Sequence, residues 1–215
     1  MSIPVPTVQR LASIYSVIKR LEDEKVEVIS SKGIGEILGI SPFTVRKDIN
    51  HLNLSGMDKG YEVRALKEAL DLLFGISRHR RACIAGLGRL GCAIMNFNRY
   101  LDEDIRIAAG FDSNINVVET VVTSIPVFPA FELTEKVRSM DIELGIIAVP
   151  PEYAQITADR MIKGGIKGIL NFAPVIIKTE RSDVSIKNFN ITEELRALTL
   201  MIKIKEKEMQ DEQDI

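Results

Sequence analysis

Residues 82–94 read Ala-Cys-Ile-Ala-Gly-Leu-Gly-Arg-Leu-Gly-Cys-Ala-Ile, a pattern that predicts a strand, a glycine turn and a helix. The glycines at Gly86, Gly88 and Gly91 have the spacing of a dinucleotide-binding turn. In such a turn the first glycine permits the sharp bend, the second lets a pyrophosphate approach the backbone, and the third lets the helix pack closely on the sheet. Unpaired N–H groups at the start of the helix would face the phosphates. A turn that binds nothing can have the same spacing, so the motif needs support from elsewhere in the chain.

A second apolar run supplies that support. Residues 105–112 read Ile-Arg-Ile-Ala-Ala-Gly-Phe-Asp and end in Asp112, 21 residues after Gly91. A carboxylate at about this distance accepts hydrogen bonds from the ribose of NAD(H) and repels the 2′-phosphate of NADP(H). Ser113 and Asn114 offer no arginine that could neutralise such a phosphate. The sequence therefore predicts NAD(H) as the cofactor.

Composition places few limits on function. The 215 residues are 46% hydrophobic and 27% charged, with a net charge of −2, so no global field favours nucleic acid or membrane. No apolar run approaches the ~20 residues of a membrane span, which predicts a cytoplasmic protein without a membrane partner. Cys83 and Cys92 are expected to be reduced packing residues, with a redox-active pair as the alternative.

The N-terminal part, residues 1–76, has the pattern of a winged helix-turn-helix. Helices are expected at 7–23 with Thr7 as N-cap, from Ser30 or Ser31 to 38, from Ser41-Pro42 onward, and at 64–74. A possible hairpin at 53–63 would be the wing. The exposed side of the third helix and the wing carry the residues expected to contact DNA, namely Ser41, Thr44, Arg46, Lys47, Asn50 and Lys59. The alternative is a solvated surface helix in a helical cap domain.

From residue 77 to 190 strands and helices alternate, which predicts a Rossmann-type parallel sheet in an α/β fold. A polar basic connector at 77–81 leads into the first strand. Further strands are expected at 124–128, at 142–149, at 166–170 and, more weakly, at 184–186, with helices at 133–140 and 152–163. Ligands of such sheets lie beyond the carboxyl ends of the strands. The expected cofactor residues are therefore Gly86, Leu87, Gly88, Arg89, Leu90, Gly91, Asp112, Val149, Pro150, Asn171, Phe172 and Ala173.

The C-terminal part, residues 191–215, is a single predicted helix. It is expected to run from Thr192 to about Met209 and to open with an approximate capping box at 192–195. Its apolar stripe must be buried against some other surface. The members of the stripe are Leu195, Leu198, Leu200, Met201 and Ile204.

Four stretches together resemble the Rex redox-sensing transcriptional repressors. They are residues 44–48 (Thr-Val-Arg-Lys-Asp), the turn at 86–91, residues 146–150 (Ile-Ile-Ala-Val-Pro) and, most specifically, residues 164–174, which end in Asn-Phe-Ala-Pro. The resemblance extends from about residue 3 to residue 202. It implies a homodimer with N-terminal winged helices, Rossmann domains that bind NADH or NAD⁺, and a C-terminal helix swapped onto the partner subunit. It also implies a repressor that releases operator DNA when the NADH/NAD⁺ ratio rises.

The chain departs from the family pattern at positions that matter for such a switch. Family members commonly carry an arginine, a tyrosine and an aspartate where this chain has Ser16, Phe97 and Asn190. The wing stretch at 54–61 is one residue shorter than is usual in the family. These departures predict a divergent paralogue with weaker coupling between cofactor and DNA.

Two other classes of protein fit parts of the pattern. A nicotinamide-dependent oxidoreductase would need a proton donor beside the nicotinamide, but His51 and His79 both precede the glycine turn. A nucleotide- or CoA-binding module without DNA binding could use the same Rossmann half. The basic face of the third helix favours a regulator, and no enzyme activity is expected.

Overall fold

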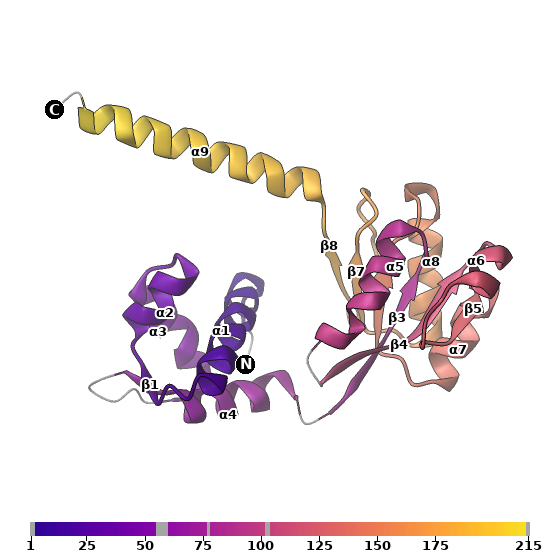
Figure 1. The fold of residues 1–215 in the computed structure, drawn as a ribbon, viewed down its shortest axis with the longest axis horizontal. Coiled ribbons are helices and arrows are strands. Elements are labelled where there is room, and N and C mark those ends of the chain that lie inside the picture. Colours follow the sequence, from indigo (N-terminus) through magenta and orange to yellow (C-terminus); the bar gives the residue numbers. More distant parts are fainter. Residues whose placement is uncertain (1–2, 55–59, 77, 102–103, 214–215) are drawn as a thin grey trace. The chain divides into compact units, whose positions relative to one another are not determined.

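The computed structural model describes residues 3–54, 60–76, 78–101 and 104–213. The chain divides into two compact units, Met1–Arg78 and His79–Ile215 (Figure 1). Each unit has a hydrophobic core of its own.

The first unit is helical with one small sheet. Its helices are α1 (Val5–Asp23), α2 (Ser31–Leu38), α3 (Pro42–Ile49), a 3-10 turn (Asn50–Leu52) and α4 (Val63–Phe74). Strand β1 (Val28–Ile29) pairs antiparallel with β2 (Tyr61–Glu62). The helices enclose a core to which α1 and α4 contribute most of the large side chains, among them Leu11, Ile14, Ile18, Leu66 and Leu70.

Local capping explains where α2 and α3 begin and end. The hydroxyl of Ser30 accepts a hydrogen bond from the N–H of Gly33 at 3.0 Å, and that of Ser41 accepts one from the N–H of Thr44 at 3.1 Å. Gly39 ends α2 with a φ of 66°, a left-handed conformation that favours glycine. The predicted bounds of α2 and the start of α3 are confirmed.

The start of α1 differs from the prediction. The N-cap is Pro4, and Thr7 lies inside the helix with 6% of its surface exposed. A proline in the first turn needs no N–H partner, so the helix can begin before the threonine. The Thr7 hydroxyl instead accepts a hydrogen bond from Arg10 Nη2 at 3.1 Å.

Only part of the predicted wing is described. Residues 55–59, and with them Lys59, lie outside the described residues. The described strand of this stretch, β2, pairs with β1. The wing stretch is thereby joined to the segment between α1 and α2.

The second unit contains a six-stranded parallel sheet in the order β5-β4-β3-β6-β7-β8. The strands are β3 (Arg80–Ala85), β4 (Ile105–Asp112), β5 (Val127–Pro129), β6 (Leu144–Ile147), β7 (Gly168–Asn171) and β8 (Ser185–Asn188). The chain therefore starts in the middle, runs outward to one edge, and then crosses back to build the other half. This is the doubly wound order of a Rossmann fold.

Helices cover both faces of this sheet (Figure 1). The helices are α5 (Arg89–Asn96), α6 (Ile115–Thr120), α7 (Leu133–Ser139) and α8 (Pro151–Gly164), with short 3-10 turns at Phe97–Tyr100 and Ala130–Glu132. Because side chains alternate along a strand, Ala82 and Ile84 of β3 pack on the side of α5, and Cys83 and Ala85 pack on the side of α7 and α8. Both faces of β3 are buried.

Several predicted boundaries in this unit were wrong. Arg80 and Arg81 belong to β3 and not to a connector, because both pair with β4. The predicted strand at 142–149 is shorter in the structure, where β6 covers Leu144–Ile147. Helix α6 was not predicted; Asn114 caps it by accepting a hydrogen bond from the N–H of Asn116 at 3.0 Å.

The last helix, α9, runs from Ile191 to Gln213. Its cap is Asn190 and not the predicted Thr192: Asn190 Oδ1 accepts from the N–H of Thr192 at 2.9 Å, and its amide donates to Glu193 at 3.1 Å. Every α9 side chain whose burial is described is exposed. Within the described part of the chain, no helix combines the length and apolar character needed to cross a bilayer.

Candidate functional site

The glycine turn after β3 is shaped by contacts with the end of β6. Gly86 has a φ of 91°, and a Cβ atom there would lie 2.5 Å from the carbonyl oxygen of Ala148. A Cβ atom on Gly91 would overlap the carbonyl oxygen of Gly86. Both positions therefore require glycine for reasons internal to the fold.

Gly88 is different from the other two glycines. Its φ is −67°, which any residue can adopt, and a Cβ atom there would have no protein atom within 4 Å. The fold does not need a glycine at this position. The open space over Gly88 lies at the start of α5, where main-chain N–H groups without a helical partner can bind an anion. The turn thus fits the close approach of a pyrophosphate.

Asp112, at the end of β4, is held against the same turn. Its Oδ2 accepts a hydrogen bond from the main-chain N–H of Leu87 at 2.7 Å, and its Oδ1 accepts from the N–H of Asn114 at 2.8 Å. Each carboxylate oxygen has a second lone pair, so Asp112 can still accept from a ribose hydroxyl. The structure thus brings Asp112 into contact with the glycine turn, the two features that the sequence predicts to form one nucleotide site.

The carboxyl end of β6 completes this side of the site. Strands β3 and β6 are neighbours whose onward connections run in opposite directions, which is the point where such sheets bind ligands. Val149 is half-buried and lies beside the turn, since its Cγ1 would be 2.9 Å from a Cβ atom on Gly86. Pro150 is exposed and caps α8.

The end of β7 is organised by a buried amide. Asn171 has no exposed surface, and its side-chain NH₂ donates to the carbonyl oxygen of Val175 at 2.7 Å and to Asn188 Oδ1 at 2.9 Å. Its Oδ1 accepts from the N–H of Ala173 at 2.9 Å. The Asn171 side chain therefore holds the loop after β7 in shape. The ring of Phe172 is half-buried and packs edge-on against Phe189, with the ring centres 5.4 Å apart.

The predicted DNA residues other than Lys59, which lies outside the described residues, lie on and around the exposed side of α3. Arg46, Lys47 and Asn50 are exposed, whereas Val45 and Ile49 are buried. Arg46 Nη1 donates to the hydroxyl of Ser31 at the start of α2, at 3.0 Å. The hydroxyls of Ser41 and Thr44 share a hydrogen bond of 2.8 Å and belong to the cap of the helix.

Sequence reasoning missed the residue that fixes α3 in place. Asp48 is 1% exposed and accepts two hydrogen bonds from Arg10 of α1, from Nε at 2.6 Å and from Nη2 at 2.8 Å. This pair raises the pKa of the Arg10 guanidinium. The signal was available, because Val45, Asp48 and Ile49 share the helical face that packs inward, and a carboxylate on such a face needs a partner.

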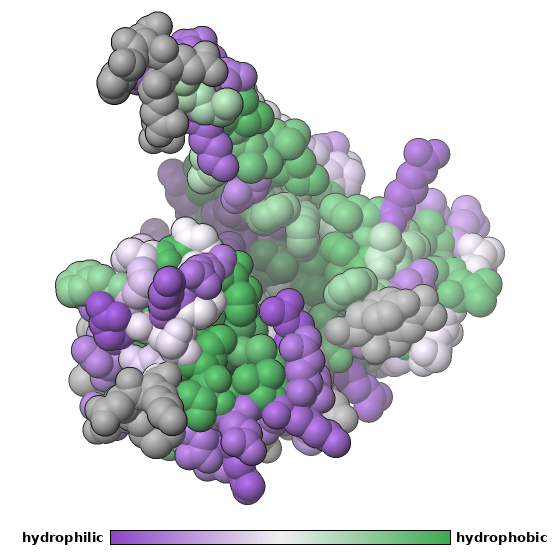
Figure 2. All heavy atoms as spheres, turned by 60° about the vertical axis from the view of Figure 1, so that its left-hand side comes forward, coloured by the Kyte–Doolittle hydropathy of each residue, from purple (hydrophilic) through white to green (hydrophobic). Residues whose placement is uncertain are grey.

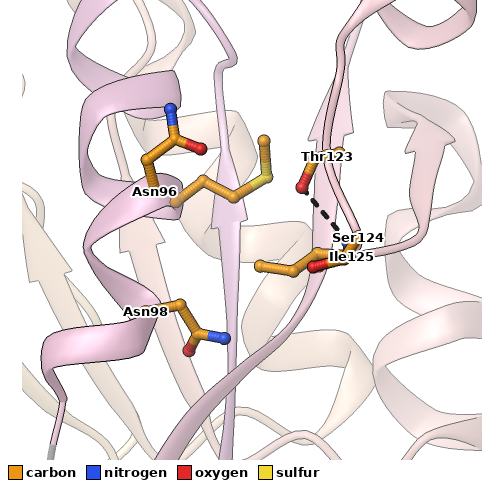
Figure 3. Close-up of a pocket in the computed structure, with 6 residues that line it drawn as sticks. Asn96, Asn98, Thr123, Ser124 and Ile125 are labelled. Atoms are coloured by element: carbon orange, nitrogen blue, oxygen red, sulfur yellow. Dashed lines mark hydrogen bonds between the residues drawn. The ribbon is translucent and has the colours of Figure 1, made fainter.

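A cavity of about 390 Å³ lies away from the glycine turn. Its lining is Met95, Asn96, Asn98, Thr123, Ser124 and Ile125, from the last turn of α5 onward and from the segment before β5 (Figure 3). The Asn98 side chain is already hydrogen-bonded within the fold, since its Oδ1 accepts from the main-chain N–H of Ile107 at 2.7 Å. Since α5 starts at the glycine turn and this cavity adjoins its other end, the two are separate.

The two cysteines are free thiols, as predicted. Burial raises the pKa of the Cys83 thiol to about 12, so this residue stays neutral. The Cys92 thiol donates to the carbonyl oxygen of Leu87 at 3.0 Å. Among the described residues there is no cluster of side chains that could hold a metal ion.

Two family models match the chain. Residues 2–50 match the model described as "Putative DNA-binding protein N-terminus", and residues 77–175 match the model described as "CoA binding domain". The two matches fall on the two halves of the chain that carry α3 and the glycine turn.

Full-length relatives agree with both models. The chain is 37% identical over 202 residues to redox-sensing transcriptional repressor Rex 1 of Thermotoga maritima, covering 93% of this chain and 96% of the relative. It is 34% identical over 209 residues to the Rex repressor of Desulforamulus reducens, covering 96% and 99%.

Solved structures give the same result. The crystal structure of RSP, a Rex-family repressor, superposes with a TM-score of 0.84 at 26% identity, covering 98% of this chain and 99% of RSP. The complex of RSP with beta-NAD+ and operator DNA superposes with a TM-score of 0.82 at 26% identity, covering 99% and 97%. The chain therefore belongs to the Rex family of redox-sensing transcriptional repressors.

Proposed function

We propose that this protein is a DNA-binding transcriptional repressor that senses the NADH/NAD⁺ ratio through its Rossmann domain. The observation that carries the proposal is the open side of Gly88, beside an Asp112 carboxylate held at the same turn. A glycine that the fold itself does not need is expected where a pyrophosphate touches the backbone. The related RSP structures with beta-NADH and with beta-NAD+ and operator DNA support both halves of the proposal.

The turn at Gly86–Gly91 would hold the pyrophosphate through main-chain N–H groups at the start of α5, including those of Arg89 and Leu90, whereas the N–H of Leu87 is donated to Asp112. Asp112 would accept hydrogen bonds from the adenosine ribose. The strand ends would take the nicotinamide half, with Val149, Pro150, Phe172 and Ala173 beside it and Asn171 shaping the loop. When bound, NADH and NAD⁺ would differ there in one hydride, and hence in the charge of the ring.

On the DNA side, Arg46 and Lys47 would contact phosphates or guanine edges, and Asn50 would pair with adenine. Ser41 and Thr44, at the start of α3, would lie beside the sugar-phosphate backbone of the DNA. Lys59 would contact the DNA from the wing. The support is the exposure of Arg46, Lys47 and Asn50 on one helix whose other face is buried.

We further propose three functional parts, at 1–76, 77–190 and 191–215, with α9 as the dimerisation helix. The stripe on α9 is half or more exposed at each of Leu195, Leu198, Leu200, Met201 and Ile204. Figure 2 shows hydrophobic side chains along this helix. An exposed apolar stripe of this length marks a surface that is buried against a partner, which supports a homodimer. In the proposed dimer the α9 helices are swapped between subunits, and the protein works in the cytoplasm.

The function is tested by selecting DNA from a randomised palindromic library and then titrating NADH and NAD⁺ separately into the complex. We expect a selected operator, binding of both nucleotides, and weaker operator binding with NADH. Failure to select any sequence would contradict the proposal. Truncation after residue 190 should turn the dimer into a monomer in sedimentation experiments.

Variants of α3 test which helix reads the operator. Arg46→Ala and Lys47→Ala should each weaken binding and reduce the slope of log affinity against log salt by roughly one unit if the side chain contacts a phosphate. Lys163→Ala, an exposed position on α8, is the matched control and should change neither. Nucleotide affinity should be the same in all four proteins. Full operator affinity of both α3 variants across salt concentrations would exclude α3 as the reading helix.

A nucleotide- or CoA-binding module is the second candidate, favoured by the match of residues 77–175 to a CoA-binding model. It is separated from the first by titrating CoA, NADH and NAD⁺ into the protein in parallel. Tight CoA binding without selection of DNA would favour this candidate.

A further inference from the structure

Phe43 is an exposed aromatic side chain in the first turn of α3. Ser41 caps the helix and Pro42 occupies its first position, so Phe43 is the second residue of the helix. It is 69% exposed, although Val45 and Ile49 of the same helix are fully buried. The core of this unit therefore gains little from the Phe43 ring.

The position of Phe43 on the helix relates it to the proposed DNA contacts. Lys47 follows it by four residues and Asn50 by seven, a spacing that places side chains on one face of a helix. The backbone stays helical through Asn50, whose φ and ψ are −56° and −24°. Phe43, Lys47 and Asn50 thus form one exposed strip along α3 that starts with an aromatic ring.

Chemistry limits what this ring can do against DNA. A phenyl ring has no hydrogen-bond donor for a phosphate and no acceptor for an amino group. In the major groove the apolar group on a base edge is the 5-methyl group of thymine. Residues at the start of a recognition helix are the ones that contact base edges.

We propose that Phe43 reads a thymine in each operator half-site by apolar contact with its 5-methyl group. The inference rests on the proposed function, since it requires α3 to enter the major groove. Lys47 and Arg46 supply the positive charge that brings the duplex to this face, and Phe43 adds a preference that charge cannot give. Phe43 is then a specificity-determining residue.

The probe that tests this is the palindromic DNA selected by the wild-type protein, with each thymine replaced in turn by deoxyuridine, which lacks only the methyl group. At one thymine per half-site we expect deoxyuridine to weaken wild-type binding about fourfold, the factor for one methyl group removed from water. Phe43→Ala should bind the thymine and deoxyuridine operators equally. Its salt slope should match that of the wild type, since no charge is lost.

The matched control is Leu72→Ala, which removes an exposed apolar side chain from α4 of the same unit. It should keep full operator affinity and full sensitivity to deoxyuridine. Thermal unfolding of Phe43→Ala should match the wild type because the ring is exposed, so a loss of binding cannot be attributed to unfolding.

Three results would overturn the proposal while leaving the proposed function intact. They are wild-type affinity of Phe43→Ala for the selected operator, equal sensitivity of both proteins to every deoxyuridine, and a change in the association state of Phe43→Ala without a change in thymine preference. The last of these would assign Phe43 to a contact between proteins. If the wild-type protein selects no DNA at all, the proposed function and this inference both fail.

Discussion

The main-chain N–H of Leu87 donates a hydrogen bond to Asp112 Oδ2 across 2.7 Å. This bond joins the end of β4 to the glycine turn after β3, two segments that meet only because their strands are neighbours in the sheet. The acid that is expected to bind the ribose also holds the turn that is expected to bind the pyrophosphate. Substitution of Asp112 should therefore affect two parts of the cofactor site at once.

Nucleotide choice follows from the charge of Asp112. NADH should bind at least tenfold more tightly than NADPH, because the carboxylate would repel a 2′-phosphate. Asp112→Asn should narrow this ratio, since the amide oxygen can still accept from Leu87 but carries no charge. Calorimetry with both nucleotides on both proteins measures the effect. Equal binding of NADPH and NADH by the wild type would contradict the prediction.

The three glycines of the turn should respond differently to alanine. Gly88→Ala should leave stability unchanged or raise it by about 0.5 kcal/mol, because its φ suits alanine and no protein atom is near. The same change should weaken NADH binding by about tenfold or more, since the methyl group would occupy the space for the pyrophosphate. Gly91→Ala should instead destabilise the fold by about 1–3 kcal/mol through overlap with the Gly86 carbonyl oxygen. Urea unfolding and calorimetry on the two variants separate these effects.

Asp48, the buried partner of the Arg10–Asp48 ion pair, should stabilise the fold. Asp48→Ala should lower the free energy of unfolding by about 3 kcal/mol, the low end for breaking a buried pair, because Arg10 is one third exposed and can reach water. Lys47→Ala, the exposed neighbour, should change it by less than about 0.5 kcal/mol. Replacing both partners together, as Arg10→Met with Asp48→Leu, should recover most of the loss. Equal unfolding midpoints for Asp48→Ala and Lys47→Ala would show that the pair contributes nothing.

Alkaline pH should destabilise the protein through Cys83. Burial raises the pKa of the folded thiol from 9.0 to about 12, so above pH 9 the unfolded thiol ionises while the folded one does not. Its contribution to stability is complete below pH 9 and is lost progressively as the pH rises toward 12. The free energy of unfolding should fall more steeply with pH in the wild type than in Cys83→Ala, by up to about 1.4 kcal/mol per pH unit. Parallel slopes for the two proteins between pH 9 and 10.5 would contradict this.

The oxidation state of the bound nucleotide should have only a weak effect on operator binding in this chain. Asn190, which stands where the family commonly has an aspartate, is engaged as the cap of α9, and the Ser16 hydroxyl donates to the carbonyl oxygen of Ala12 at 3.3 Å. A ligand shifts a two-state dimer only by its differential affinity for the two states, so losing contacts made in one state reduces the shift. Operator affinity should differ between the NADH-loaded and NAD⁺-loaded protein by less than about tenfold, or ~1.4 kcal/mol.

The triple variant Ser16→Arg, Phe97→Tyr and Asn190→Asp provides the matched gain-of-function control. It should widen the difference in operator affinity between the NADH-loaded and the NAD⁺-loaded protein. A hundredfold difference in the wild type would mean that these three positions do not couple the sites.

Much of the fold could be predicted because its signals are local. The caps at Ser30 and Ser41 begin helices, and the left-handed glycines at Gly39 and Gly75 end them, in each case through contacts with residues a few positions away. The glycine spacing and the buried strands around it predicted the Rossmann sheet for the same reason. The coupling of nucleotide binding to DNA binding could be predicted only from the resemblance to the Rex repressors, because the periodicity of helices and strands carries no such information.

The sequence by itself determined most of the helices and strands, the glycine turn and the class of ligand, since each depends on neighbouring residues or on the period of a strand or helix. Only the tertiary structure decided that Asp48 meets Arg10, that Asn171 turns inward to Asn188, and that Asp112 holds Leu87. These pairs are separated by 38, 17 and 25 residues. A buried polar side chain needs a hydrogen-bond partner, and the fold decides which distant group lies within reach, so no local pattern records which group that will be.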